Sequence, residues 1–146
     1  MDLLKWLLKV FKTSGSHKQR KWGRKVTVER NARRMRRRYP LNRHGLFGEA
    51  GKGRVTGKGV RKEHKRVIKS ANQNRTARDF YSKIGRGGKE SALPNGHGKR
   101  TDLPDKTTII YREKTSTPNS PAVSLNTRTD SKIKNQKIHF EKEEKE

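Results

Sequence analysis

Basic residues are concentrated in the first half of the chain, and this limits where a folded core can form. Residues 1–74 contain 23 of the 39 Lys and Arg residues but only 4 of the 14 acidic residues. Apolar residues make up 27% of the chain, against roughly 45–50% in a typical globular protein. A segment with low hydrophobicity and high net charge cannot bury enough apolar surface to fold alone. We therefore expect a basic, mostly disordered N-terminal half with short helices, followed by a compact domain.

Local patterns divide the chain into four segments. Residues 1–12 are predicted to form a basic amphipathic helix, because apolar residues recur there at helical spacing between lysines. Residues 13–74 read as an Arg- and Gly-rich arm or linker, with a helical turn or two expected within residues 60–70. Residues 75–140 are predicted to form the folded domain, and residues 141–146 a charged tail.

The formal net charge of +25 indicates a polyanionic partner, because binding to phosphates releases counterions. Within the arm, Val26, Val28, Ala32 and Met35 form too thin an apolar stripe to bury much surface. An arginine-rich segment of this kind often orders only on binding RNA or DNA. The alternative is a solvated linker without a specific ligand. The proposed nucleic-acid-binding residues are Arg33, Arg34, Arg36, Arg37 and Arg38.

One helix is expected at the start of the folded domain. Thr76 is a predicted N-cap, with Asp79 three residues later in a weaker form of the capping box. An apolar stripe follows at the spacing of one helix face, and Gly85 ends the pattern. The stripe consists of Ala77, Phe80, Tyr81 and Ile84.

Short β-prone runs separated by turn residues follow the helix. They cover residues 89–93, 98–103, 107–112, 122–125 and 133–140, and TTIIYR is the strongest of them. The predicted fold class is α+β, with one helix followed by a small antiparallel sheet of about four strands.

Strand alternation predicts two different faces for this sheet. One face, together with Phe80, Tyr81 and Ile84 of the helix, is predicted to form the core through Ile109, Tyr111, Val123, Leu125, Ile138 and Phe140. The other face collects Ile110, Arg112, Ser124, Lys137 and His139. A cationic face that carries a histidine suits a phosphodiester, although any half-exposed sheet shows polar residues on its outer face.

Residues 75–140 resemble the C-terminal toxin domains of bacterial polymorphic toxins of the RHS, contact-dependent-inhibition and LXG types. The segments that carry the resemblance are RTARDFYSKIGRGGKE, LPNGHGK, LPDKTTIIYREKTSTPNSPAVSLN and IKNQKIHF. The resemblance implies a small ribonuclease of the barnase–EndoU–colicin–RelE kind, which acts in the bacterial cytoplasm after secretion or delivery. It also implies an acidic immunity protein as a partner. A decayed toxin fragment is an alternative, because the family's Asp-Gly pairs are replaced by Asp105-Lys106 and Pro118-Asn119.

The chemistry predicted for this domain is metal-independent RNA cleavage, because the acidic residues are scattered among turns and strand ends and no cofactor is indicated. His139 is the first choice for proton transfer, since the ordinary pKa of an imidazole lies near neutrality. Arg112 would grip the phosphate in bidentate fashion, and Lys137 would add charge beside it. Ser116 and Ser120 are predicted to donate hydrogen bonds to a non-bridging phosphate oxygen. His97 is predicted as a reserve proton-transfer group.

Two other functions are compatible with the sequence. A non-catalytic RNA- or DNA-binding protein would use the arginine-rich arm as its ligand-binding element, with the sheet as a scaffold. A membrane-active protein would use residues 1–12 to contact a lipid surface.

Overall fold

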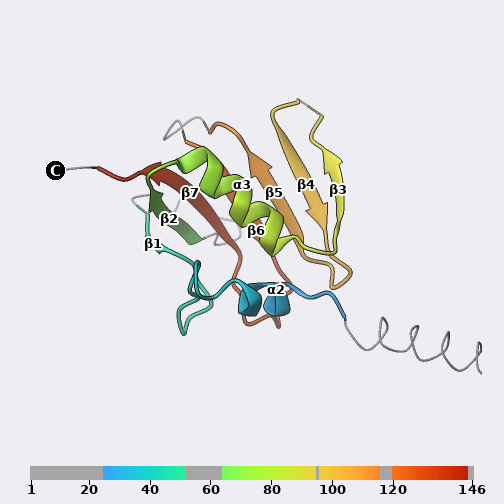
Figure 1. Ribbon diagram of the computed structural model, residues 1–146. Helices are drawn as coiled ribbons and strands as arrows, with labels where there is room; N and C mark the ends of the chain where they lie inside the picture. The colour runs from blue at the N-terminus through green and yellow to red at the C-terminus, as the bar shows by residue number, and fades with distance from the viewer. Residues whose placement is uncertain (1–24, 52–63, 95, 116–119, 145–146) are drawn as a thin grey trace, which may run out of the picture.

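The computed structural model of the protein describes residues 25–51, 64–94, 96–115 and 120–144. Among these residues, two helices and seven strands of one sheet are present (Figure 1). Their bounds, in chain order, are α2 (Val28–Arg34), β1 (Glu49–Ala50), β2 (His64–Ser70), α3 (Gln73–Ile84), β3 (Lys89–Ala92), β4 (Gly98–Asp102), β5 (Thr108–Arg112), β6 (Ala122–Asn126) and β7 (Gln136–Lys142).

The sheet is mixed, with the strand order β1-β2-β7-β6-β5-β4-β3. Strands β3 to β7 form an antiparallel meander, while β2 pairs in parallel with β7 along its whole length. The predicted fold class, with one helix and about four strands after a mostly disordered half, is therefore wrong. Residues 28–34 of the half that was expected to be mostly disordered form a second helix, and residues 49–50 and 64–70 extend the sheet beyond β7.

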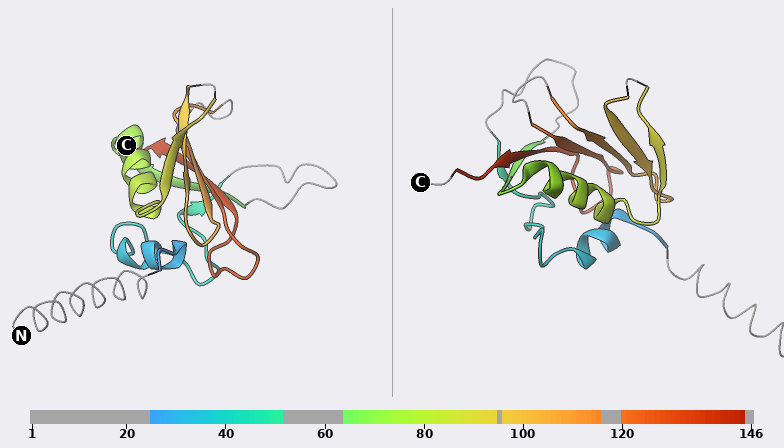
Figure 2. Two further views of the ribbon diagram at one scale, coloured as in Figure 1. Left: turned by 90° about the vertical axis from the view of Figure 1, so that its right-hand side faces the viewer. Right: turned by 45° about the horizontal axis from the view of Figure 1, so that its top comes forward.

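Helix α3 lies across one face of the sheet (Figures 1 and 2). Its N-cap is Asn72, whose side-chain oxygen accepts a hydrogen bond from the backbone N–H of Arg75 at 3.2 Å. The predicted cap at Thr76 is wrong by about one turn, because Asn is as good a cap and Thr76 already lies within the helix. The helix ends at Gly85, as predicted.

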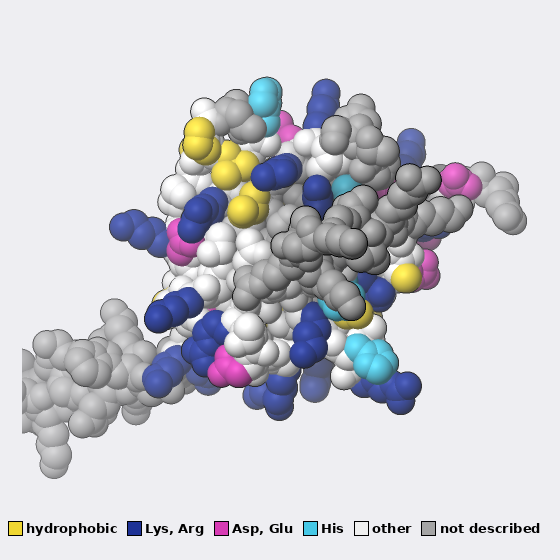
Figure 3. Space-filling model, turned by 180° about the vertical axis from the view of Figure 1, so that it is seen from behind, with side chains coloured by type: hydrophobic (Ala, Val, Ile, Leu, Met, Phe, Trp, Pro, Cys, Tyr) yellow, Lys and Arg dark blue, Asp and Glu magenta, His cyan; other side chains and the backbone are white. Residues whose placement is uncertain are grey.

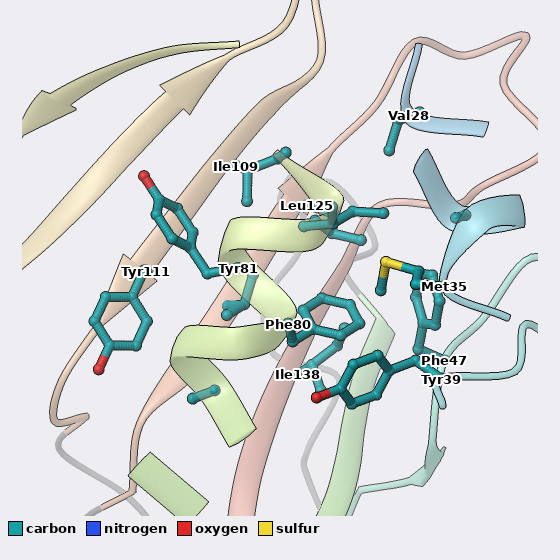
Figure 4. Packing of buried hydrophobic residues seen from close by; sticks show 14 of the residues in the cluster. Val28, Met35, Tyr39, Phe47, Phe80, Tyr81, Ile109, Tyr111, Leu125 and Ile138 are labelled. Carbon is teal, nitrogen blue, oxygen red and sulfur yellow. The ribbon is translucent and has the colours of Figure 1, made fainter. Parts of the chain in front are cut away.

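The nine predicted core residues are all buried, and they lie between α3 and the sheet (Figure 4). Phe80 occupies the centre of this core. Its ring lies 5.1 Å from that of Tyr39, 5.0 Å from that of Phe47 and 5.5 Å from that of Phe140, measured between centroids. Tyr39 and Phe47 come from the half of the chain that was expected to be disordered, so the described part of that half completes the core.

Helix α2 packs against the C-terminal end of α3. Thr27 caps it, since its hydroxyl accepts from the N–H of Arg30 at 3.1 Å. The Asn31 amide donates to the carbonyl oxygens of Ile84 and Arg86 at 2.8 and 3.0 Å. Val28, Ala32 and Met35 are buried, so the apolar stripe that looked too thin is sufficient when a neighbouring helix covers it.

Both described helices lie on the same side of the sheet (Figure 2). The opposite side, here called the outer face, is covered by no helix of the described residues. Within those residues, no helix is long and apolar enough to cross a membrane. The predicted amphipathic helix of residues 1–12 lies outside the described residues, as do residues 52–63 of the glycine-rich segment.

Candidate active site on the outer face of the sheet

The strand register places Arg112 and His139 on the outer face, in one row across three strands. Arg112 of β5 lies opposite Ala122 of β6, which in turn lies opposite His139 of β7. Two strand spacings separate the two residues, so their Cα atoms are roughly 10 Å apart. The prediction that a guanidinium and an imidazole share this face is confirmed.

A second row of the outer face adds positive charge beside the first. It runs from Ile110 through Ser124 and Lys137 to Lys65 of β2. Lys65 was not predicted as a site residue. The strand that contains Lys65 has the sequence HKRVIKS, whose basic residues show no alternation between apolar and polar positions. The position of Lys65 on the outer face follows only from the pairing of β2 with β7.

His139 is nearly buried, with 6% of its surface exposed. Its Nδ1 atom lies 3.4 Å from the hydroxyl oxygen of Ser120, and either group can donate, depending on the imidazole tautomer. Burial lowers the pKa of His139, and the charges of Lys137 and Lys65 lower it further. The imidazole is therefore neutral at pH 7 and can accept a proton.

The cations around His139 are available to an anionic ligand. Arg112 and Lys65 are exposed and Lys137 is half-buried. Across the described ranges, no ion pair involves any of these three side chains. Arg100 of β4 also points to this face, but its guanidinium is bound to Asp102 at 3.1 Å. Figure 3 shows Lys and Arg side chains spread over this side of the molecule, with a concentration along its lower rim.

The remaining predicted catalytic residues are distributed unequally. Ser120 is buried beside His139, as described above, while Ser116 lies outside the described residues. His97 is exposed in the turn between β3 and β4, where its carbonyl oxygen accepts from the N–H of Glu113 at 3.2 Å. Three strand spacings, roughly 14 Å, separate β4 from β7, so His97 and His139 cannot act on one phosphate.

The five predicted nucleic-acid-binding arginines belong to a different surface. Arg33 and Arg34 lie in the last turn of α2, and the three that follow lie in the turn after it; all five are exposed. Arg38 pairs with Asp79 at 3.6 Å and lies 5.9 Å from the centre of the Tyr39 ring. Helix α2 lies on the same side of the sheet as α3 (Figure 2), whereas the register of β7 puts His139 on the outer face, so one ligand can touch both only by passing around the end of the sheet.

Carboxylates and imidazoles do not converge in the part of the chain that the structure covers. No group of three or more His, Asp or Glu side chains in it is placed to hold a metal ion. Comparison of the chain with protein-family models, with curated proteins and with solved structures gives no match. The site must therefore be interpreted from its own geometry.

Proposed function

We propose that this protein is a small ribonuclease that cleaves RNA without a metal ion, using the outer face of the sheet. The observation that carries the proposal is the row of Arg112, Ala122 and His139, in which a neutral imidazole and an exposed guanidinium face the same way. The resemblance of residues 75–140 to toxin domains of bacterial polymorphic toxins supports the same activity, although a fold never settles chemistry alone.

The proposed reaction needs a base and a set of cations. His139 accepts the proton of a ribose 2′-hydroxyl, whose oxygen then attacks the adjacent phosphorus. Arg112, Lys137 and Lys65 stabilise the negative charge that develops on the phosphorane oxygens. The bond from phosphorus to the 5′ oxygen breaks, and that oxygen takes a proton from solvent. The products are a 2′,3′-cyclic phosphate and a 5′-hydroxyl.

Cleavage of an end-labelled RNA in the presence of EDTA tests the proposal. We expect the full-length protein to produce 2′,3′-cyclic phosphate ends and to leave an all-deoxy strand intact. Replacing the base, in His139→Ala, should lower the rate by at least about 100-fold. His97→Ala is the matched control, because His97 is exposed in the turn between β3 and β4, three strand spacings from β7, and its rate should equal that of the wild type.

A second candidate function is RNA or DNA binding without cleavage. The observation that favours it is the contrast in exposure between His139, at 6%, and the five exposed arginines of α2 and the following turn. This function predicts salt-dependent binding and no product. If no RNA is cleaved, or if His139→Ala cleaves as fast as the wild type, the ribonuclease proposal fails. Binding that is then lost on replacing Arg33, Arg34, Arg36 and Arg37 by Gln would establish the second function.

An acidic inhibitor is the partner expected for the ribonuclease, because the outer face is cationic and the toxin resemblance implies an immunity protein. Binding of such an inhibitor should weaken when Arg112 and Lys65, which are both exposed on this face, are replaced by Gln.

A further inference from the structure

A second concentration of positive charge lies at the end of the sheet where β2 and β7 begin. Here a surface depression of about 690 Å³ is lined by the turn of residues 41–46, by the first residue of β2 and by the segment that precedes β7. We call it the basic depression, after the charged and imidazole side chains in its lining, which are Arg43, His44, His64, Lys132 and Lys134. A smaller depression of about 210 Å³ shares His64 and Lys134 with it.

The walls of the basic depression are held in place by a buried amide. Gln136 is fully buried, and its side-chain oxygen accepts from the N–H of Phe47 at 2.8 Å. Its NH₂ group donates to the carbonyl oxygens of Gly45 and Lys134 at 3.0 and 2.8 Å. The N–H of Lys134 donates to Gly45 as well, at 3.1 Å. These bonds fix the turn of residues 41–46 against the segment that carries Lys132 and Lys134, so the cations are presented by a rigid scaffold.

Gly45 makes this close contact sterically possible. Its φ is +76°, in the left-handed region that favours glycine, and a Cβ atom at this position would lie 1.9 Å from the carbonyl oxygen of Lys132. Asn42 stabilises the same turn, because its side-chain oxygen accepts from the N–H groups of His44 and Leu46 at 2.8 and 3.0 Å.

The cations of the basic depression are not neutralised within the described residues. None of the side chains that line it is acidic, and none takes part in an ion pair. Arg43 instead donates to Nε2 of the neighbouring His44 at 3.3 Å. Like charges held together on a rigid scaffold repel one another, and an anion bound between them removes that repulsion.

We propose that the basic depression is a phosphate-binding site. Lysine ammonium groups, a guanidinium and imidazole N–H groups are the donors that proteins use for phosphate oxygens. The depression has room for more than one phosphate group, and we therefore take the ligand to be a chain of phosphates. This chemistry is shared by the backbone of an RNA strand and by a free oligophosphate. Only the RNA source depends on the proposed function, because a free oligophosphate would bind whether or not the protein cleaves RNA.

The site is distinct from the row that contains His139. His64 lies opposite Gln136 at the start of β7, three residues before His139. Because side chains alternate between faces along a strand, His64 and Gln136 lie on the opposite face of the sheet from His139. The rise along a strand puts the two positions roughly 10 Å apart. A strand of RNA that bound both would therefore wrap around this end of the sheet.

Binding of inorganic tripolyphosphate to the full-length protein, followed by amide chemical shifts, tests the proposal directly. We expect saturable shifts concentrated in residues 41–46, at His64 and in residues 132–135. The double variant Lys132→Gln/Lys134→Gln should raise the dissociation constant by roughly tenfold or more, because two charge-assisted hydrogen bonds are lost. The matched control is Lys89→Gln/Lys106→Gln, which removes the same charge from exposed positions outside the depression and should change the constant less than about twofold.

A single-stranded RNA decamer, measured by fluorescence anisotropy at several salt concentrations, separates the two sources. If RNA is the ligand, Lys132→Gln/Lys134→Gln should also weaken RNA binding and reduce the salt slope by roughly 1.4, as expected for two lost phosphate contacts on a single strand. If the ligand is a free oligophosphate, RNA binding stays unchanged. Tripolyphosphate shifts that do not saturate, or equal losses in the two double variants, overturn the proposal. Neither result depends on whether the protein cleaves RNA.

Discussion

His139 is the buried member of the four histidines that the structure describes. Its protonation would place a third positive charge next to Lys65 and Lys137 in a poorly solvated environment, and this cost is what lowers its pKa. Protonation carries no such cost in the unfolded chain, because the imidazole of His139 is then surrounded by water. Folding and protonation of this residue are therefore linked.

The linkage predicts a loss of stability in mild acid. Because the pKa of His139 is lower in the folded protein than its ordinary value of 6.5, the unfolded chain binds more protons as the pH falls through that value. The free energy of unfolding should therefore decrease from pH 7.5 downward, until the pH passes the folded pKa. Urea denaturation between pH 5 and 8 measures this decrease.

One variant isolates the contribution of His139 to this pH dependence. His139→Gln should lose the part of the slope that lies around pH 6. An unchanged slope in His139→Gln would show that other groups cause the pH dependence.

At the scale of elements, a charged hydrogen bond helps to join the segment after α2 to α3. The Tyr39 hydroxyl donates to the Asp79 carboxylate at 2.7 Å, and Lys83 pairs with the same carboxylate at 3.2 Å. Burial acts to raise the pKa of Asp79, but the bonds from Tyr39 and Lys83 outweigh it, so this pKa lies below its usual value. Burial, followed by the bond to Asp79, raises the pKa of Tyr39. The pair therefore stabilises the fold with the carboxylate ionised and the phenol protonated.

Removal of this hydroxyl should destabilise the protein without changing its shape. We expect Tyr39→Phe to lower the free energy of unfolding at pH 7 by about 1–2 kcal/mol, since a hydrogen bond to a charged group is lost while Asp79 keeps Lys83 as a partner. Tyr111→Phe is the matched control, because the Tyr111 hydroxyl makes no hydrogen bond within the described ranges. Equal midpoints for the two variants in urea denaturation would contradict the expectation.

The elements that the sequence predicts well are those whose burial is encoded locally. Helix α3 carries its apolar stripe within twelve residues, and β5 alternates between buried and more exposed positions, so the core and the face on which Arg112 lies follow from the sequence pattern. Strand β2 has only Val67 and Ile68 as apolar residues, and it is ordered by pairing with a strand some seventy residues away. No local pattern encodes such a partner, so β2 and with it Lys65 were missed.

The exposure of candidate residues is the second feature that strand alternation does not predict. Alternation placed His139 on the outer face correctly, but a polar residue on that face was expected to be accessible. The 6% exposure of His139 depends on the segments that pack around it in the folded protein, and the pattern within one strand does not describe those segments. The basic depression was missed for a related reason, because its cations come from three separate segments of the chain.

At the scale of the whole molecule, the two halves of the chain share one sheet. Strand β7 lies between β2 from the basic half and β6 from the meander, and it is hydrogen-bonded to both. Tyr39 and Phe47 of the basic half also contact Phe80 in the centre of the core. The meander and α3 therefore lack a complete core of their own.

A fragment that spans residues 71–144 should consequently fail to fold cooperatively. Its β7 would become an edge strand, and Phe80 would lose the rings of Tyr39 and Phe47, which amounts to removing two large core side chains at about 3–5 kcal/mol each. Near-ultraviolet circular dichroism and urea denaturation, applied to the fragment and to the full-length protein, measure whether the fragment folds cooperatively. A cooperative transition at a midpoint close to that of the full-length protein would refute it.

The interior position of β7 has a consequence for synthesis. A chain leaves the ribosome from its N-terminus, and domains fold as units once all of their elements have emerged. Every other described element precedes β7, so the sheet cannot close until residue 142 has been translated and released. His139 lies in that same strand. Until β7 has emerged, the nascent chain lacks the imidazole of His139, and any activity of the outer face begins only after this strand has paired with β2 and β6.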